Sequence, residues 1–165
     1  MDPRATFGIN VFVSFVSSIV ITKLYIWSWL RTMSRNDALI RLMAPHMFLR
    51  FIGLSFIVPG VVSSTLPSAF AVPAAWGDFV AGLLAIIATV AYSRRAAWAM
   101  VAVWIFNIWG AADLLFAFLQ GARVQLDPGT LGAAYFIVTA IVPPLLVTHA
   151  LMFLLLAKNQ RKDTL

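Results

Sequence analysis

The sequence predicts an all-α integral membrane protein, a five-transmembrane-helix bundle with its N-terminus outside the cytoplasm and its C-terminus cytoplasmic. Two observations lead to this prediction: five long apolar runs, and basic residues that lie mostly on one side of them. Of the 165 residues, 62% are hydrophobic and only 11% are charged, whereas about 25% of residues are charged in an ordinary soluble domain. A soluble fold could not cover its surface with so few charges.

Each apolar run is long enough to cross a hydrocarbon core of about 30 Å at a helical rise of about 1.5 Å per residue. Within a single transmembrane domain over residues 1–165, we expect helices at about 7–30, 45–63, 74–93, 96–120 and 131–157. A further interfacial helix is predicted over 34–43. Ser34 would cap it, with Asp37 three residues on, and it would run into the second span with a kink at Pro45.

The direction of insertion follows from the Lys and Arg residues. Two of them, Arg4 and Arg123, fall on one side of the predicted membrane, and Lys23 lies inside the first span. The remaining nine fall on the other side: Arg31, Arg35, Arg41, Arg50, Arg94, Arg95, Lys158, Arg161 and Lys162. Since the side richer in Lys and Arg is cytoplasmic, and an odd number of spans separates the termini, the N-terminus is expected outside. We expect a multi-pass protein of the bacterial inner (cytoplasmic) membrane.

The net charge of +6 does not indicate nucleic-acid binding. The basic residues flank the apolar runs and form no single patch, which is the pattern that orients membrane helices. The expected surroundings are therefore a lipid bilayer, with no nucleic-acid partner. The chain has no cysteine, which excludes disulfides, thiolate catalysis and iron–sulfur ligation.

Small and polar residues recur with a period near 3.5 in every span. The first span shows the pattern as Asn10, Ser14, Ser17 and Ile21, the third as Asp78, Gly82, Ala85, Thr89 and Tyr92, and the fourth as Val103, Asn107, Gly110 and Leu114. Such residues share one face of a helix, and small or polar faces belong where membrane helices touch. We interpret these faces mainly as packing seams, with an enclosed wet or ligand-filled cavity as the alternative.

Polar residues in the outer half of the bundle form the first group of candidate ligand-binding residues. They are Asp113, Asn107, Asp78, Tyr135 and Asn10. Asp113 lies about seven residues inside the fourth span, so an ionised carboxylate there needs a partner, or the group must hold its proton. Such an acidic zone suits a cation, a proton or an amine. A structural hydrogen-bonding role is the alternative for Asp113.

Basic residues in the inner half form the second group: Arg50, His46, His149 and Lys23. A cationic inner pocket suits a lipid phosphate or another anionic head group. Lys23 and Arg50 can also extend to the cytoplasmic surface, and His149 can equally be a core histidine with satisfied hydrogen bonds.

The residues offer little support for an enzyme or a cofactor. We expect no haem between His46 and His149, because their positions place the two imidazoles about 10 Å apart in depth. Zinc lacks ligands at normal spacing, so no metal site is expected. The chain has no glutamate and no recognisable nucleophile triad or phosphate loop. No catalytic residue is assigned.

Three functions fit these observations. The first is a small membrane protein that binds or transports a small or lipid-like ligand in the bundle interior, such as a small molecule or an anionic lipid. The second is a subunit or assembly partner of a larger membrane complex, either a homo-oligomer or a complex with another membrane chain. The third is a lipid-modifying enzyme with His46 or His149 as base.

Overall fold

The computed structural model describes residues 2–157, and in them the chain is helical apart from its connections. The elements, in chain order, are α1 (Pro3–Ile21), η1 (Thr22–Ile26), α2 (Trp27–Leu30), α3 (Arg35–Leu49), η2 (Arg50–Ile57), α4 (Ser68–Ser93), α5 (Ala99–Arg123), η3 (Pro128–Ala134), η4 (Ile137–Ile141) and α6 (Val142–Ala157). η1 and η4 are π-helical, and η2 and η3 are 3-10 helices.

These elements combine into five helical rods that are long and apolar enough to cross a membrane. The rods are Pro3–Leu30, Arg35–Ile57, Ser68–Ser93, Ala99–Arg123 and Ile137–Ala157. The predicted helical bundle of five such rods is therefore confirmed. Lys158, Arg161 and Lys162, three of the basic residues behind the predicted orientation, lie outside the described residues.

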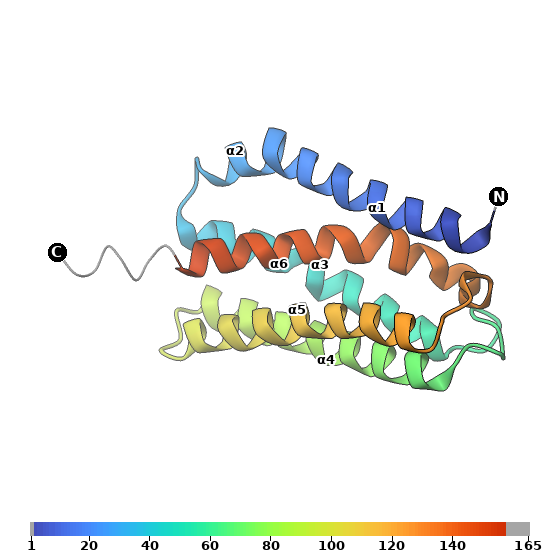
Figure 1. Ribbon diagram of the computed structural model, residues 1–165. Coiled ribbons are helices and arrows are strands. Elements are labelled where there is room, and N and C mark those ends of the chain that lie inside the picture. Colours follow the sequence, from blue (N-terminus) through green and yellow to red (C-terminus); the bar gives the residue numbers. More distant parts are fainter. Residues whose placement is uncertain (1, 158–165) are drawn as a thin grey trace.

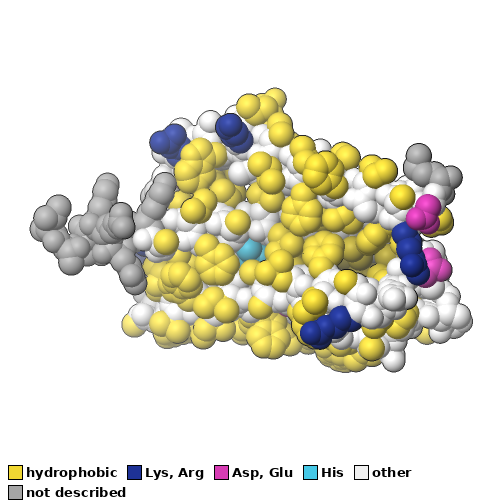
Figure 2. All heavy atoms as spheres, in the orientation of Figure 1, with side chains coloured by type: hydrophobic (Ala, Val, Ile, Leu, Met, Phe, Trp, Pro, Cys, Tyr) yellow, Lys and Arg dark blue, Asp and Glu magenta, His cyan; other side chains and the backbone are white. Residues whose placement is uncertain are grey.

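The rods run lengthwise through one bundle (Figure 1). α4 and α5 lie along one side, α3 and α6 occupy the middle, and α1 lies along the opposite side. The N-terminus and the connections 58–67 and 124–127 gather at one end of the bundle, which we call the N-terminal end. The connections 31–34 and 94–98 and the end of α6 gather at the other end. The face of the bundle seen in Figure 2 is covered mainly by hydrophobic side chains.

The second rod differs from the prediction. α3 begins after the cap residue Ser34, whose Oγ accepts a hydrogen bond from the backbone N–H of Asp37 at 3.1 Å, and continues through Pro45. The segment predicted as a separate interfacial helix, 34–43, is the first part of this rod and buries apolar residues such as Leu39 and Met43 in the bundle. Pro45 removes one backbone hydrogen bond. The helix nevertheless continues through it, with buried residues on both sides of the proline. The rod ends at Ile57, before a turn at Gly60, where φ is +85°.

Two apolar clusters fill the bundle interior. The first lies toward the C-terminal end of α6 and includes Met43, Phe106 and Met152. The second lies toward the N-terminal end of the bundle and includes Phe56 and Leu114. On each of the rods α3–η2, α4, α5 and η4–α6, the residues between the two clusters include buried polar side chains. The fold therefore places a polar layer at mid-bundle, between two apolar layers.

α1 is peripheral and contributes little to this core. It has no buried residue, and it contacts mainly η4 and α6. The predicted small-residue seam of the first span is therefore not a packed seam, since Asn10 and Ser17 are both exposed.

Candidate functional site

Arg50 lies at the centre of the polar layer, at the point where α3 passes into η2. Its side chain is 0% exposed. Nη1 donates to Asp78 Oδ1 at 2.5 Å and to Asp113 Oδ2 at 2.9 Å. Nη2 donates to the carbonyl oxygen of Gly110 at 2.5 Å and faces Nε2 of His149 at 3.0 Å. One planar guanidinium thereby connects the second rod to α4, α5 and α6, a role that its several donors in a fixed geometry allow.

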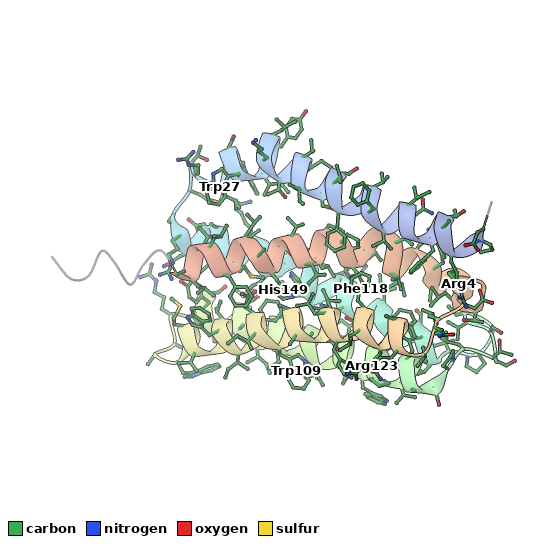
Figure 3. All side chains as sticks on the ribbon, viewed as in Figure 1. Arg4, Trp27, Trp109, Phe118, Arg123 and His149 are labelled. Carbon is green, nitrogen blue, oxygen red and sulfur yellow. The ribbon has the colours of Figure 1, made fainter. Side chains whose placement is uncertain are left out.

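The protonation pattern of His149 follows from its partners. Arg50 has only donors, so Nε2 of His149 must accept, and Nδ1 must carry the proton. His149 points from α6 toward α5 (Figure 3), where its Nδ1 lies 2.7 Å from Asn107 Oδ1, and the amide nitrogen of Asn107 donates to the backbone carbonyl of His149 at 3.3 Å. The amide is thus oriented to accept the imidazole proton. Asn107 therefore sets the orientation of the His149 ring, and His149 Nε2 accepts a hydrogen bond from the guanidinium of Arg50.

His46 extends the network away from Arg50. Its Nε2 lies 2.8 Å from Thr148 Oγ1, and Thr148 Oγ1 donates its own proton to the carbonyl oxygen of Leu145. A hydroxyl has one proton, so Nε2 of His46 is the donor and Nδ1 is the bare ring nitrogen. That Nδ1 is buried without a hydrogen-bond partner in the part of the chain described. The His46 and His149 rings are 4.3 Å apart between centroids.

Glycines let the helices approach closely around the two carboxylates. A Cβ added at Gly53 on η2 would overlap the carboxylate of Asp78. A Cβ added at Gly77 on α4 would overlap the carboxylate of Asp113. Each carboxylate therefore lies directly against the backbone of a neighbouring helix, in space that any larger residue would occupy. This close approach is what small residues provide at helix contacts in membrane proteins.

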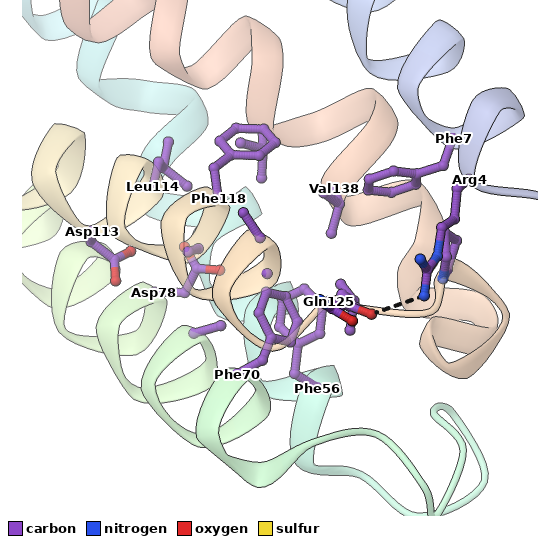
Figure 4. Close-up of a pocket in the computed structure, with 17 residues that line it drawn as sticks. Arg4, Phe7, Phe56, Phe70, Asp78, Asp113, Leu114, Phe118, Gln125 and Val138 are labelled. Atoms are coloured by element: carbon purple, nitrogen blue, oxygen red, sulfur yellow. Dashed lines mark hydrogen bonds between the residues drawn. The ribbon is translucent and has the colours of Figure 1, made fainter.

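A cavity of about 490 Å³ extends from the two carboxylates toward the N-terminal end of the bundle. Figure 4 shows Asp78 and Asp113 at one end of this cavity and Arg4 and Gln125 at the other, with Phe118 on the wall between them. The cavity is lined mainly by apolar side chains: Phe7, Phe56, Phe70, Leu114, Phe118, Leu126, Val138 and Val142. Small molecules are typically bound in cavities of about 300–1,000 Å³ with apolar walls and a few polar groups.

The polar side of this cavity consists of the carboxylates and not of the guanidinium. Asp78 and Asp113 line the cavity, with side chains 8% and 9% exposed, whereas Arg50 is fully enclosed behind them. At the opposite end, the exposed Arg4 donates to the carbonyl oxygen of Gln125 at 3.4 Å.

The predicted separation into an outer acidic zone and an inner cationic zone is wrong. Asp78, Asp113 and Asn107 of the first group contact Arg50 and His149 of the second. The expected 10 Å difference in depth between the two histidines is wrong for the same reason, since their rings are in contact. The second rod begins at residue 35 and not at 45, so His46 and Arg50 lie much deeper in the bundle than expected.

Three predicted residues lie outside this network. Asn10 on α1 donates to the hydroxyl of Tyr135 at 2.6 Å in an exposed pair. Lys23 is exposed in η1. Neither Asn10 nor Tyr135 nor Lys23 lines the cavity.

Sequence reasoning missed Gly77 and Thr148. Gly77 lies outside the periodic seam of its span, and its only signal is that it precedes Asp78. Thr148 is next to His149 and takes part only because the second rod brings His46 alongside α6.

The chain matches a protein-family model. The model described as "Domain of unknown function (DUF8737)" matches residues 6–157. No curated protein matches the chain, and no solved structure matches it.

Proposed function

The chain belongs to the family described as a domain of unknown function (DUF8737), and we propose from its own site that it binds, and transports, a small or lipid-like ligand inside a membrane-embedded bundle. The observation that carries the proposal is the cavity of about 490 Å³, with apolar walls and two buried carboxylates at one end. A purely structural ion pair needs no such space beside it. The cavity is of a size and chemistry suited to an amphipathic small molecule.

The arrangement of the seams favours ligand binding over a role as a subunit of a larger complex. The buried polar residues of α3–η2, α4, α5 and α6 contact one another within this chain. The charged groups of Arg50, Asp78 and Asp113 are therefore paired without a second chain. Three buried atoms, His46 Nδ1, Arg50 Nε and Thr89 Oγ1, have no hydrogen-bond partner among the described residues.

The positions of the histidines also weigh against the proposed lipid-modifying enzyme. His46 and His149 are 0% and 1% exposed, and neither lines the cavity. Nε2 of His149 is engaged by Arg50, so the ring nitrogen that a base would use is occupied.

Filling the cavity is expected to abolish ligand binding. We expect a photoactivatable diazirine analogue of decanol, added to the protein in nanodiscs, to label cavity residues of α4 and α5. In an Ala117→Phe variant this labelling should fall to background, because a phenyl ring on a cavity-lining position of α5 occupies the ligand's space. Tandem mass spectrometry of the labelled peptides measures the effect.

Ala112→Phe is the matched control, since Ala112 is exposed on the same helix and does not line the cavity. Its labelling pattern should equal that of the wild type. Labelling of cavity residues that persists in Ala117→Phe, or labelling spread evenly over the outer faces of the helices, would contradict ligand binding in this cavity.

We further propose that the bundle is inserted in a bacterial cytoplasmic membrane with its N-terminus outside. The support is the excess of Lys and Arg at the end of the bundle where α2, α4 and α6 end. The chain contains no cysteine, so single cysteines can be placed at either end without background. In intact cells, a membrane-impermeant maleimide should label Ser64→Cys. It should label Ala97→Cys only after the cells are permeabilised, and the opposite pattern would refute this orientation.

A further inference from the structure

The charges around the cavity do not balance. Asp78 and Asp113 share a single guanidinium, and both hydrogen bonds come from one nitrogen of it, Nη1 of Arg50. The other carboxylate oxygens, Oδ2 of Asp78 and Oδ1 of Asp113, have no hydrogen-bond partner among residues 2–157. With one positive and two negative groups, one negative charge remains in excess if both carboxylates are ionised.

No other charged group of the neighbouring elements compensates this excess. From α6 and α3, the nearest titratable groups are His149 and His46, and each carries a single ring proton in the hydrogen-bond pattern derived above. α1 contributes only Arg4, which is exposed at the far end of the cavity. On α5, Arg123 is exposed and donates to Gln120. Within the described residues, the carboxylate pair therefore faces the cavity with one counter-charge too few.

Leaving one carboxylate ionised without a partner in an apolar site is costly. Two species can remove the excess charge: a proton on one of the two carboxyl groups, or a positively charged ligand in the cavity. Both would occupy the same place, so they must compete. A cationic head group is suited to this position because its charge compensates the excess negative charge of the carboxylates that line the cavity, and a primary ammonium can also donate hydrogen bonds to them.

Other classes of ligand fit less well. An anion would need the guanidinium, but Arg50 does not line the cavity, whereas the carboxylates of Asp78 and Asp113 do and would repel it. A divalent metal ion would need several oxygen or nitrogen ligands. In the described part of the chain, no group of three or more His, Asp or Glu residues could hold one.

We infer that the cavity takes an organic monocation with an apolar tail, its charged head at Asp78 and Asp113 and its tail along Phe118 and Phe70, in exchange for one proton. This inference rests on the proposed ligand binding and specifies its ligand class. The net charge of the site is the same before and after exchange: one positive charge enters and one proton leaves to solvent. The aromatic side chains on the wall offer apolar surface to the tail.

Probes that share one tail and differ in their head group test this directly. Decylamine, decyltrimethylammonium, decanol and decanoate are each added to the wild type in nanodiscs, in competition with the diazirine photolabel. Concentrations are expressed as mole fraction in the nanodisc lipid. Both cations are expected to displace the label at about tenfold or more lower mole fraction than decanol, and decanoate should be the weakest competitor.

The proton exchange has a separate readout. Decyltrimethylammonium has no proton of its own, so any acidification of a weakly buffered sample on binding comes from the protein. We expect up to one proton to be released per bound cation, and competition by both cations should weaken as the pH falls. In Asp113→Asn, proton release and the advantage of cations over decanol should both disappear, whereas Asp127→Asn, at an exposed carboxylate outside the cavity, should behave as the wild type.

The outcomes separate this inference from the proposed function. If decanol and the cations displace the label equally, or binding releases no proton, the ligand class is wrong although the cavity still binds ligands. If no probe displaces the label, ligand binding in the cavity is itself refuted. If Asp113→Asn does not fold, the ligand class is still tested by the head-group comparison and the proton release in the wild type.

Discussion

Replacing Arg50 by methionine should destabilise the protein by about 3–5 kcal/mol, because removing one partner of a buried ion pair leaves the other charge uncompensated. Here two carboxylates, Asp78 and Asp113, lose their shared cation, and the carbonyl of Gly110 loses its side-chain donor. Methionine has a similar length, so the loss of packing volume is small. The change is measured as the loss of folded, monodisperse protein in detergent and as a lower thermal midpoint.

Two further variants identify the cause. Arg41→Met removes an exposed arginine from the same helix, one that stacks over Trp29 at 4.8 Å, and should shift the midpoint only slightly. The triple variant Arg50→Met, Asp78→Asn, Asp113→Asn should recover much of the lost stability, because it removes the charges together. A triple variant no more stable than Arg50→Met would show that the loss came from packing and not from charge.

Gly110→Ala should destabilise the bundle, although alanine normally favours a helix over glycine by about 1 kcal/mol. A Cβ at this position would lie 2.6 Å from Cε1 of His149 and 3.1 Å from Nη2 of Arg50. Both groups are buried and hydrogen-bonded, so neither can move without losing a partner. We expect a loss of about 1–3 kcal/mol, measured as a lower thermal midpoint in detergent.

Gly8→Ala is the matched control, because a Cβ at Gly8 on α1 meets no atom within 4 Å. It should leave stability unchanged or slightly raised, as expected from helix propensity alone. Equal midpoints for Gly110→Ala and Gly8→Ala would mean that α5 is not held as closely to Arg50 and His149 as the structure has it.

The period of the apolar and small residues correctly predicted which face of α5 points into the bundle. Val103, Asn107, Gly110 and Leu114 were predicted to share a buried face, and all four are buried. The same reasoning failed on the first rod, whose predicted seam has exposed members. A period reveals which residues share a face, but a peripheral helix can carry the same pattern with only one neighbour to pack against.

Six of the candidate residues lie together in the structure, but their division into two zones was wrong. Asp78, Asp113, Asn107, His46, Arg50 and His149 stood out in the sequence because charged and polar groups are costly within apolar spans, and all six belong to the central network. Their division into two zones came from estimating each residue's depth from the end of its own predicted span.

The number of apolar rods, the polar residues they carry and the rotation of α5 about its axis can be read from the order of residues alone, because helical periodicity depends only on that order. Which charges meet is known only from the packed bundle. That depends on how far each helix slides along its neighbours, which periodicity does not specify. The second rod begins ten residues earlier than predicted (35 and not 45), about 15 Å of helical rise. This moves Arg50 from the inner surface to the centre of the bundle, where glycines on the adjoining helices leave space for it to bind two carboxylates at once.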